Sequence, residues 1–278
     1  MTSSDPDQSA ARPARLRADD VSLGYDRRTV STALSAEILE GSFTVIIGPN
    51  ACGKSTLLKA FARLLRPSAG RILLDGRDLA EFRPKEAARL VGLLPQSATA
   101  PDGITVEELV QRGRYPHQGL VRRWARADQD AVVTALVKTD LTSLAGVPVA
   151  ELSGGQRQRA WVAMALAQET SVLLLDEPTT FLDIAHQVDL LDLFADLHER
   201  GTTIVAVLHD LNQAARYATN LIVVKEGRVV ATGAPSEVIT EDLITDVFGL
   251  ECRVIEDPET GGALVVPRDR RRSGRPAG

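Results

Sequence analysis

The chain has 278 residues, of which 44% are hydrophobic and 25% charged, and its formal net charge is −5. These values are ordinary for a globular protein with a substantial buried core, and the acidic balance provides no broad basic surface for nucleic acid. The two cysteines, Cys52 and Cys252, are far apart and in no metal-ligand spacing, so we expect reduced thiols in a cytoplasmic protein.

Both ends of the chain have a composition typical of disorder. Residues 1–14 are rich in Ser, Asp, Pro and Ala and contain no apolar run, which argues against a secretory signal. The basic stretch at residues 268–278 is expected to be a disordered, solvated tail. The longest apolar runs, such as residues 172–175 and 203–208, are too short to span a bilayer. Any membrane role is therefore expected to come through a partner chain.

Between these ends, strand patterns alternate with helical patterns. We expect strands over residues 44–47, 71–74, 90–94, 172–175, 203–208 and 221–224. We expect helices over residues 55–65, 106–112, 129–138, 156–167 and 188–197. Strands that alternate with helices predict an α/β fold with a mainly parallel sheet covered on both faces. From residue 105 to about 166 the strand signal disappears, which predicts a helical insertion into the α/β core.

The first chemical motif lies between the expected strand 44–47 and the helix that follows it. The pattern G-x-x-x-x-G-K-[ST] is matched by Gly48, Pro49, Asn50, Ala51, Cys52, Gly53, Lys54, Ser55 and Thr56. Its glycines let backbone N–H groups turn inward, and the helix N-terminus adds its positive dipole end, so the loop predicts a phosphate site. We expect Lys54 to reach the β- and γ-phosphates of ATP and the Ser55 hydroxyl to bind Mg²⁺.

Two acids follow the apolar run at residues 172–175. Asp176 and Glu177 would lie at the carboxyl edge of the sheet, where ligands of α/β proteins bind. Alone, this pattern fits a solvated strand end equally well. Because a phosphate loop occurs in the same chain, we expect Asp176 to hold Mg²⁺ and Glu177 to polarise the attacking water.

A third motif starts at Leu152 and has the sequence LSGGQRQR. Ser153 can cap a helix, and Gly154, Gly155 and Gln156 would present N–H groups to a second anion, although a merely capped helix has the same spacing. This motif resembles the signature that defines ATP-binding cassette proteins, and the resemblance extends from about Leu16 to Pro267.

The resemblance implies the ATP-binding cassette fold over residues 15–267. This fold has a phosphate-loop core with a mainly parallel sheet, an antiparallel β subdomain and a helical subdomain at about 97–166. It also implies roles for single residues. Tyr25 is similar to the aromatic residue that stacks on adenine, and Gln96 to the glutamine that contacts Mg²⁺ and the lytic water. Asp183 resembles the residue of the loop that crosses the dimer interface, and His209 the histidine that contacts the γ-phosphate.

In this family two copies pack head to tail. ATP bound by Lys54 of one copy would be covered by Ser153, Gly154, Gly155 and Gln156 of the other. Two positions depart from the family pattern: Cys52 in the phosphate loop and Phe181 in the interface loop. The helix N-terminus beside Cys52 predicts a stabilised thiolate that reacts with thiol reagents, and a buried, inert thiol is the alternative.

Two features of other cassette proteins are not found in this sequence. It lacks the second cassette of translation factors and the coiled coil of DNA-maintenance proteins, which favours a transporter ATPase. The segments 109–117, 177–189 and 247–254 resemble those of metal-chelate importers, most closely the iron(III)-siderophore type. Haem or vitamin B12 import remains open, and an exporter or a soluble non-transport role is less favoured.

The expected partners follow from this class. They are a second copy of the chain, integral-membrane permease subunits docked near residues 96–123, and indirectly an extracytoplasmic substrate-binding protein, without nucleic acid. We expect a peripheral protein on the cytoplasmic face of the cell membrane.

Overall fold

The computed structural model describes residues 13–26, 28–96, 99–119, 124–180 and 182–269. Most of the two expected disordered ends therefore lies outside the described residues, as does Phe181. The described chain enters its first strand, β1 (Ala14–Tyr25), almost at once. Near the other end, the backbone N–H of Arg268 still donates to Glu251 O at 2.9 Å.

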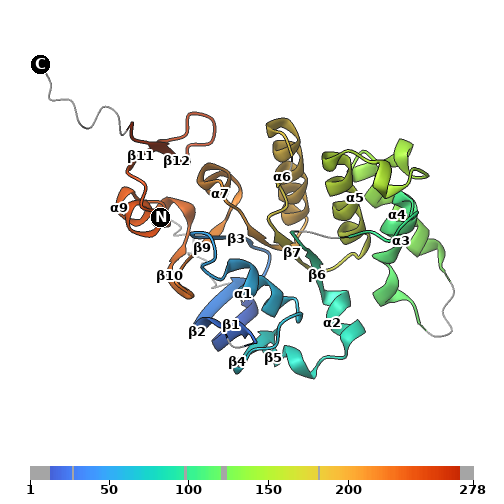
Figure 1. The fold of residues 1–278 in the computed structure, drawn as a ribbon, viewed down its shortest axis with the longest axis horizontal. Helices are drawn as coiled ribbons and strands as arrows, with labels where there is room; N and C mark the ends of the chain where they lie inside the picture. Colours follow the sequence, from blue (N-terminus) through green and yellow to red (C-terminus); the bar gives the residue numbers. More distant parts are fainter. Residues whose placement is uncertain (1–12, 27, 97–98, 120–123, 181, 270–278) are drawn as a thin grey trace, which may run out of the picture.

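A large sheet forms the centre of the molecule (Figure 1). Its strand order is β10 (Arg228–Gly233), β9 (Asn220–Lys225), β3 (Phe43–Ile47), β8 (Thr203–Val207), β7 (Val172–Asp176) and β6 (Val91–Leu94). The strands from β9 to β6 are parallel, and β10 joins the edge antiparallel to β9. The predicted parallel sheet is confirmed.

The five parallel strands of the large sheet are buried on both faces because nearly all of their positions are apolar, whereas the edge strand β10 is partly exposed. Successive side chains of a strand point to opposite faces. In β7, Val172 and Leu174 join one hydrophobic cluster, whereas Leu173 and Leu175 join another. The first cluster is closed by α1 (Lys54–Phe61) and the small sheet, and the second by α6 (Ile184–Glu199) and α7 (Leu211–Tyr217).

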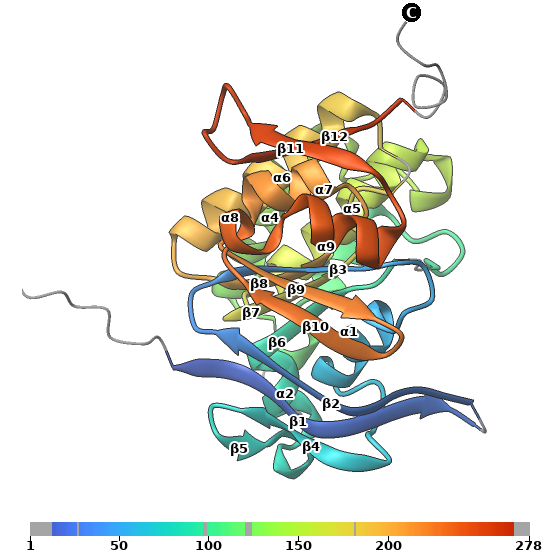
Figure 2. The same cartoon turned by 90° about the vertical axis from the view of Figure 1, so that its left-hand side faces the viewer.

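The small sheet is antiparallel and lies below α1 in Figure 2. Its order is β2 (Arg28–Leu39), β1, β4 (Ala69–Leu74) and β5 (Arg77–Asp78). The long strands β1 and β2 were not predicted from periodicity, because charged residues and irregular register interrupt their alternation. Asp20 and Ala33, for example, have positive φ angles of 48° and 49° where the pairing shifts. Helix α2 (Pro84–Leu90) then leads into β6.

The predicted helical insertion consists of α3 (Val106–Arg112), α4 (Arg126–Lys138) and α5 (Gly154–Ala167), which share a hydrophobic cluster of their own. Short 3-10 turns occur in the insertion at Tyr115–His117, Thr142–Leu144 and Val149–Glu151, and another, Leu79–Glu81, precedes α2. Thr105 caps α3: its hydroxyl accepts a hydrogen bond from Glu108 N, and the Glu108 carboxylate accepts one from Thr105 N. Buried Arg114 donates to Asp128 Oδ1 at 3.1 Å and so fixes the start of α4.

The last described elements share a hydrophobic cluster with α7. These are α8 (Pro235–Val238), α9 (Glu241–Phe248) and the hairpin of β11 (Cys252–Glu256) and β12 (Ala263–Pro267), seen at the top of Figure 2. Asn212 of α7 accepts from Val265 N at 2.7 Å and donates to Val265 O at 3.3 Å, which fastens the hairpin to that helix. Across the described ranges, we find no helix whose length and apolar content would let it cross a bilayer.

Candidate functional site

The loop between β3 and α1 has a backbone that only glycine accommodates at two positions. Gly48 has a φ of 153°, and an added Cβ would lie 2.1 Å from Val224 O of the neighbouring strand. Gly53, the residue that precedes α1, has a φ of 109°. The chain can therefore turn sharply out of the sheet into α1, whose first residues line a cavity, as a phosphate site at a helix N-terminus requires.

Lys54 is the buried cation of this loop, with 5% of its surface exposed. Its Nζ donates to Gly48 O and Pro49 O, each at 2.9 Å. Because both partners are neutral carbonyls, the ammonium keeps its full charge for an anion in the loop.

Ser55 and Asp176 bring an oxygen pair to the same place from α1 and the end of β7. Ser55 Oγ donates to Asp176 Oδ1 at 2.7 Å, although the residues are far apart in sequence. Asp176 is 3% exposed, and burial raises the pKa of its carboxyl, with the hydrogen bond from Ser55 opposing the rise. A cation at this carboxylate would offset the cost of burying it.

The oxygen donors fit Mg²⁺ bound together with phosphates rather than a cage made of protein alone. Within the part of the chain that the structure describes, no three His, Cys, Asp or Glu side chains cluster as a metal site. Mg²⁺ commonly takes one or two protein oxygens and completes its shell with waters and substrate phosphates. Ser55, Asp176 and the amide oxygen of Gln96 are a suitable set of oxygen ligands for that mode.

Glu177 stands at the centre of a second cluster. Its Oε2 accepts from Gln96 Nε2 at 2.6 Å, and its Oε1 lies 2.6 Å from His209 Nε2. Gln96, Glu177 and His209 follow β6, β7 and β8, which are adjacent parallel strands, so their carboxyl ends share one edge of the sheet. The backbone of Glu177 has a φ of 53°, a costly conformation for a residue with a side chain. Its side chain makes both short contacts from this backbone conformation.

Lys54, Ser55, Glu177 and His209 line one cavity of about 250 Å³, whereas Asp176 and Gln96 reach it only through their hydrogen bonds to Ser55 and Glu177. Its lining comprises Tyr25, Arg28, Val30, Asn50, Ala51, Cys52, Gly53, Lys54, Ser55, Thr56, Glu177 and His209. The Tyr25 side chain is 44% exposed, and Lys59 Nζ lies 5.8 Å from the centre of its ring. Sequence reasoning missed Arg28 and Val30; their alternate spacing in a strand directly after Tyr25 is the signal that would have identified them.

Ser153–Gln156 do not contribute to the described lining of this cavity. Ser153 caps α5, accepting from Gln156 N at 3.2 Å, while Gln156 Oε1 accepts from Ser153 N at 3.0 Å. An added Cβ at Gly154 would meet nothing within 4 Å, so this helix start is open. The structure therefore holds the predicted signature residues together as a separate N-terminus, apart from the phosphate loop of the same chain.

Of the two alternatives for Cys52, the structure favours the buried thiol over the stabilised thiolate. The residue is 6% exposed, and its burial raises the pKa of the thiol, more than the nearby Lys54 lowers it. Its Sγ packs beside Gly48, where an added Cβ would lie 2.9 Å away. Cys52 therefore packs against the loop at the cavity wall, and burial outweighs the helix N-terminus.

Comparisons with known proteins agree with this geometry. The family model described as ABC transporter matches residues 32–180. The ferric enterobactin transport ATP-binding protein FepC of Escherichia coli (strain K12) is 56% identical, covering 92% of this chain and 95% of that protein. The hemin import ATP-binding protein HmuV of Myxococcus xanthus (strain DK1622) is 44% identical, covering 83% of this chain and 88% of that protein.

Among solved structures, an inward-facing conformation of a transporter described as metal-chelate type superposes with a TM-score of 0.78 at 27% sequence identity. The superposition covers 93% of this chain and 99% of the other. The agreement therefore includes the small sheet and the helical insertion as well as the core of the fold.

Proposed function

The chain belongs to the ABC transporter family as an ATP-binding subunit, and on this premise we propose that it powers the import of iron(III)-siderophore complexes. Its activity is ATP hydrolysis coupled to transport. The proposed catalytic mechanism rests on one observation: Glu177 lies between Gln96 and His209 and directly follows Asp176, which bonds to Ser55.

Binding of ATP falls to the phosphate loop and its surroundings. The N–H groups at the start of α1 and the ammonium of Lys54 would take the phosphates, and the exposed ring of Tyr25 offers a stacking surface for adenine. Ser55, Asp176 and Gln96 would hold Mg²⁺, which when bound neutralises charge that develops on the phosphates.

Hydrolysis needs a water oriented toward the terminal phosphate. The carboxylate of Glu177 is the acceptor in this cluster. It would accept a hydrogen bond from that water and so orient it. His209, whose side chain is 49% exposed, can contact the phosphate while its Nε2 stays beside Glu177. Gln96 fixes the other carboxylate oxygen, so the orientation of Glu177 is set from both sides.

A second copy of the chain would complete the site. The capped N-terminus at Ser153 is open and lies apart from the cavity of its own chain, which supports a head-to-tail dimer with Ser153–Gln156 over the partner's nucleotide. Asp183, which caps α6 by accepting from His186 N at 2.9 Å, would lie at the contact between copies.

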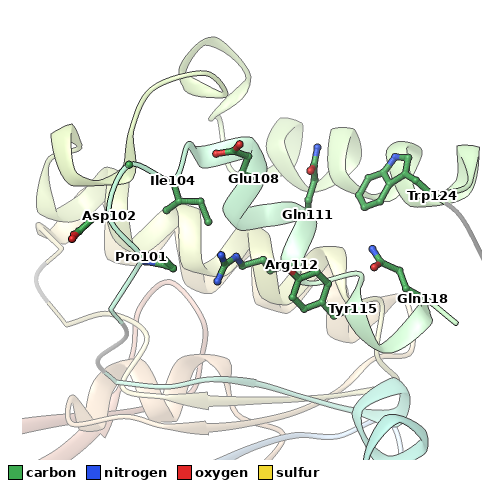
Figure 3. A pocket seen from close by; sticks show the side chains of 10 residues that line it. Pro101, Asp102, Ile104, Glu108, Gln111, Arg112, Tyr115, Gln118 and Trp124 are labelled. Carbon is green, nitrogen blue, oxygen red and sulfur yellow. The ribbon is translucent and has the colours of Figure 1, made fainter. Parts of the chain in front are cut away.

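The permease would dock on the helical insertion, in a pocket of about 540 Å³ (Figure 3). It is lined by Pro101, Asp102, Gly103, Ile104, Glu108, Gln111, Arg112, Tyr115, Gln118 and Trp124. Tyr115 is 56% and Trp124 40% exposed, and Arg112 lines the same pocket; tyrosine, tryptophan and arginine are enriched at protein interfaces. Part of the predicted docking segment, residues 97–98 and 120–123, lies outside the described residues.

The cargo assignment is supported by the relatives. Identity to the ferric enterobactin protein is higher, and extends over more of the chain, than identity to the hemin protein. The working protein would lie at the cytoplasmic face of the membrane, with a permease and an extracytoplasmic binding protein that selects the chelate.

Uptake in cells tests the proposal. Deletion of the gene should abolish uptake of radioactive iron supplied as a siderophore complex, and the wild-type gene should restore it. Lys54→Ala should fail to restore uptake, whereas Lys138→Ala, at an exposed lysine that ends α4, should restore it. If iron-chelate uptake survives deletion while haem or cobalamin uptake is lost, the siderophore assignment is wrong and the ATPase assignment stands.

A further inference from the structure

Two glutamine side chains, Gln158 and Gln187, bind the loop that follows Glu177, and a third, Gln213, binds Gln187; we name the three the glutamine clasp. Gln158 Nε2 donates to Pro178 O at 2.9 Å. Gln187 Nε2 donates to Leu182 O at 3.0 Å and to Thr179 O at 3.3 Å. Gln213 Nε2 donates to Gln187 Oε1 at 2.8 Å. The hydrogen bonds therefore run from one helix to the next by way of the loop.

The clasp residues come from the helices that carry the site. Gln158 lies on α5, four residues after Gly154 begins that helix. Gln187 lies in the first turn of α6, just after its cap Asp183. Gln213 lies in the first turn of α7, where Asp210 Oδ1 accepts from Gln213 N at 3.0 Å, immediately after His209. Each glutamine is thus within one or two turns of a residue proposed to act on ATP or at the dimer contact.

The contacts at position 187 require a side chain that both donates and accepts hydrogen bonds, as glutamine does. Its amide oxygen accepts from Gln213 while its amide nitrogen donates to two loop carbonyls, so one side chain serves as acceptor and donor at once. A carboxylate of the same size can accept but cannot donate, and it would face the carbonyls with like polarity. These hydrogen bonds are partly buried, where they are stronger than in water.

We propose that Gln187 and Gln213 are a positioning pair for hydrolysis, which holds the Glu177 loop and the His209 helix in register. The two catalytic groups leave neighbouring strands and are joined directly by the contact of 2.6 Å between Glu177 Oε1 and His209 Nε2. The Gln187–Gln213 bond ties together the segments that diverge beyond that contact. It thereby limits how far the carboxylate and the imidazole can move apart. This role rests on the proposed ATPase function.

The test compares Gln187→Leu, Gln213→Leu and the double variant by steady-state ATP hydrolysis of the full chain. We expect kcat to fall by about tenfold to a hundredfold, because a misplacement of about 1 Å costs that much. KM for ATP and binding of a fluorescent ATP analogue should stay near wild type, because the phosphate loop is untouched, and Tm is measured to verify that each variant is folded. The double variant should lose no more than the worse single variant, since both remove one connection.

Two further variants make the result decisive. Gln187→Glu keeps the size of the side chain and should lose kcat like Gln187→Leu, even if the leucine variants prove unstable. Asp189→Asn, at an exposed position of the same helix, should match wild type. Unchanged kcat in Gln187→Glu, independent losses that multiply in the double variant, or a rise in KM equal to the fall in kcat would overturn the positioning role. A wild-type chain that hydrolyses no ATP would instead refute the proposed function.

Discussion

Replacement of Glu177 by glutamine should abolish most turnover while leaving nucleotide binding intact. The amide oxygen can still accept from Gln96 Nε2, and the amide nitrogen can donate to His209 Nε2 when that nitrogen is unprotonated, so the two contacts of 2.6 Å can persist. What the variant loses is the negative charge that orients the attacking water. Loss of a general base typically costs a factor of about 10²–10⁴ in kcat, which corresponds to about 3–5 kcal/mol in the activation barrier.

The assay is release of phosphate at saturating ATP, together with binding of a fluorescent ATP analogue and the mass of the complex by light scattering. With ATP the variant should accumulate as a dimer, because the closed state forms but does not turn over. Glu226→Gln is a matched control, since Glu226 is an exposed glutamate that also has a positive φ, of 49°. A kcat near wild type for Glu177→Gln, or an equal loss in Glu226→Gln, would remove Glu177 from its proposed role.

Three further outcomes follow from the packing. Cys52 should react slowly with N-ethylmaleimide at neutral pH and faster as the pH rises toward its raised thiol pKa; mass spectrometry showing rapid modification of the folded protein would contradict its burial. Gly48→Ala should lower the urea midpoint and weaken ATP binding, because the new Cβ would meet Val224 O at 2.1 Å; unchanged binding would mean that the loop does not need this turn. Arg114→Met should lower the stability of the helical insertion by about 3–5 kcal/mol, because it leaves buried Asp128 without its guanidinium partner. Thermal unfolding measures this loss, and an unchanged Tm would contradict it.

The sequence was most informative where a local pattern and a chemical motif coincide. The apolar runs of the large sheet are continuous because those strands are buried on both faces, and the structure has strands in all of them. All predicted helices occur, although α6 begins at Ile184, four residues before the predicted start, and α1 ends at Phe61 rather than at residue 65. Asp183 caps that helix ahead of its apolar stripe, and a periodicity argument detects only the stripe.

Long-range pairing could not be derived from local patterns. The bond between Ser55 and Asp176, and the placement of Gln96 and His209 on either side of Glu177, depend on strand order in the sheet. The family resemblance supplied their roles without their geometry. The hairpin of β11 and β12 was missed because its strands are short and partly exposed, so their pattern is weak.

Buried charge distinguishes the site from the rest of the described molecule. Four charged residues are buried among the described residues: Lys54 and Asp176 at the site, and Arg114 and Asp128 in the helical insertion. Arg114 and Asp128 bond to each other, as buried charges must if they are to offset the cost of leaving water. Lys54 and Asp176 instead bond to neutral groups, namely loop carbonyls and the Ser55 hydroxyl. A buried ammonium and a buried carboxylate with neutral partners are expensive in a free-standing fold. A triphosphate beside the ammonium and a divalent cation beside the carboxylate would add opposite charge in direct contact, beyond the more distant effect of Lys54 and Lys59 on Asp176, and would so offset the energetic cost of these buried positions.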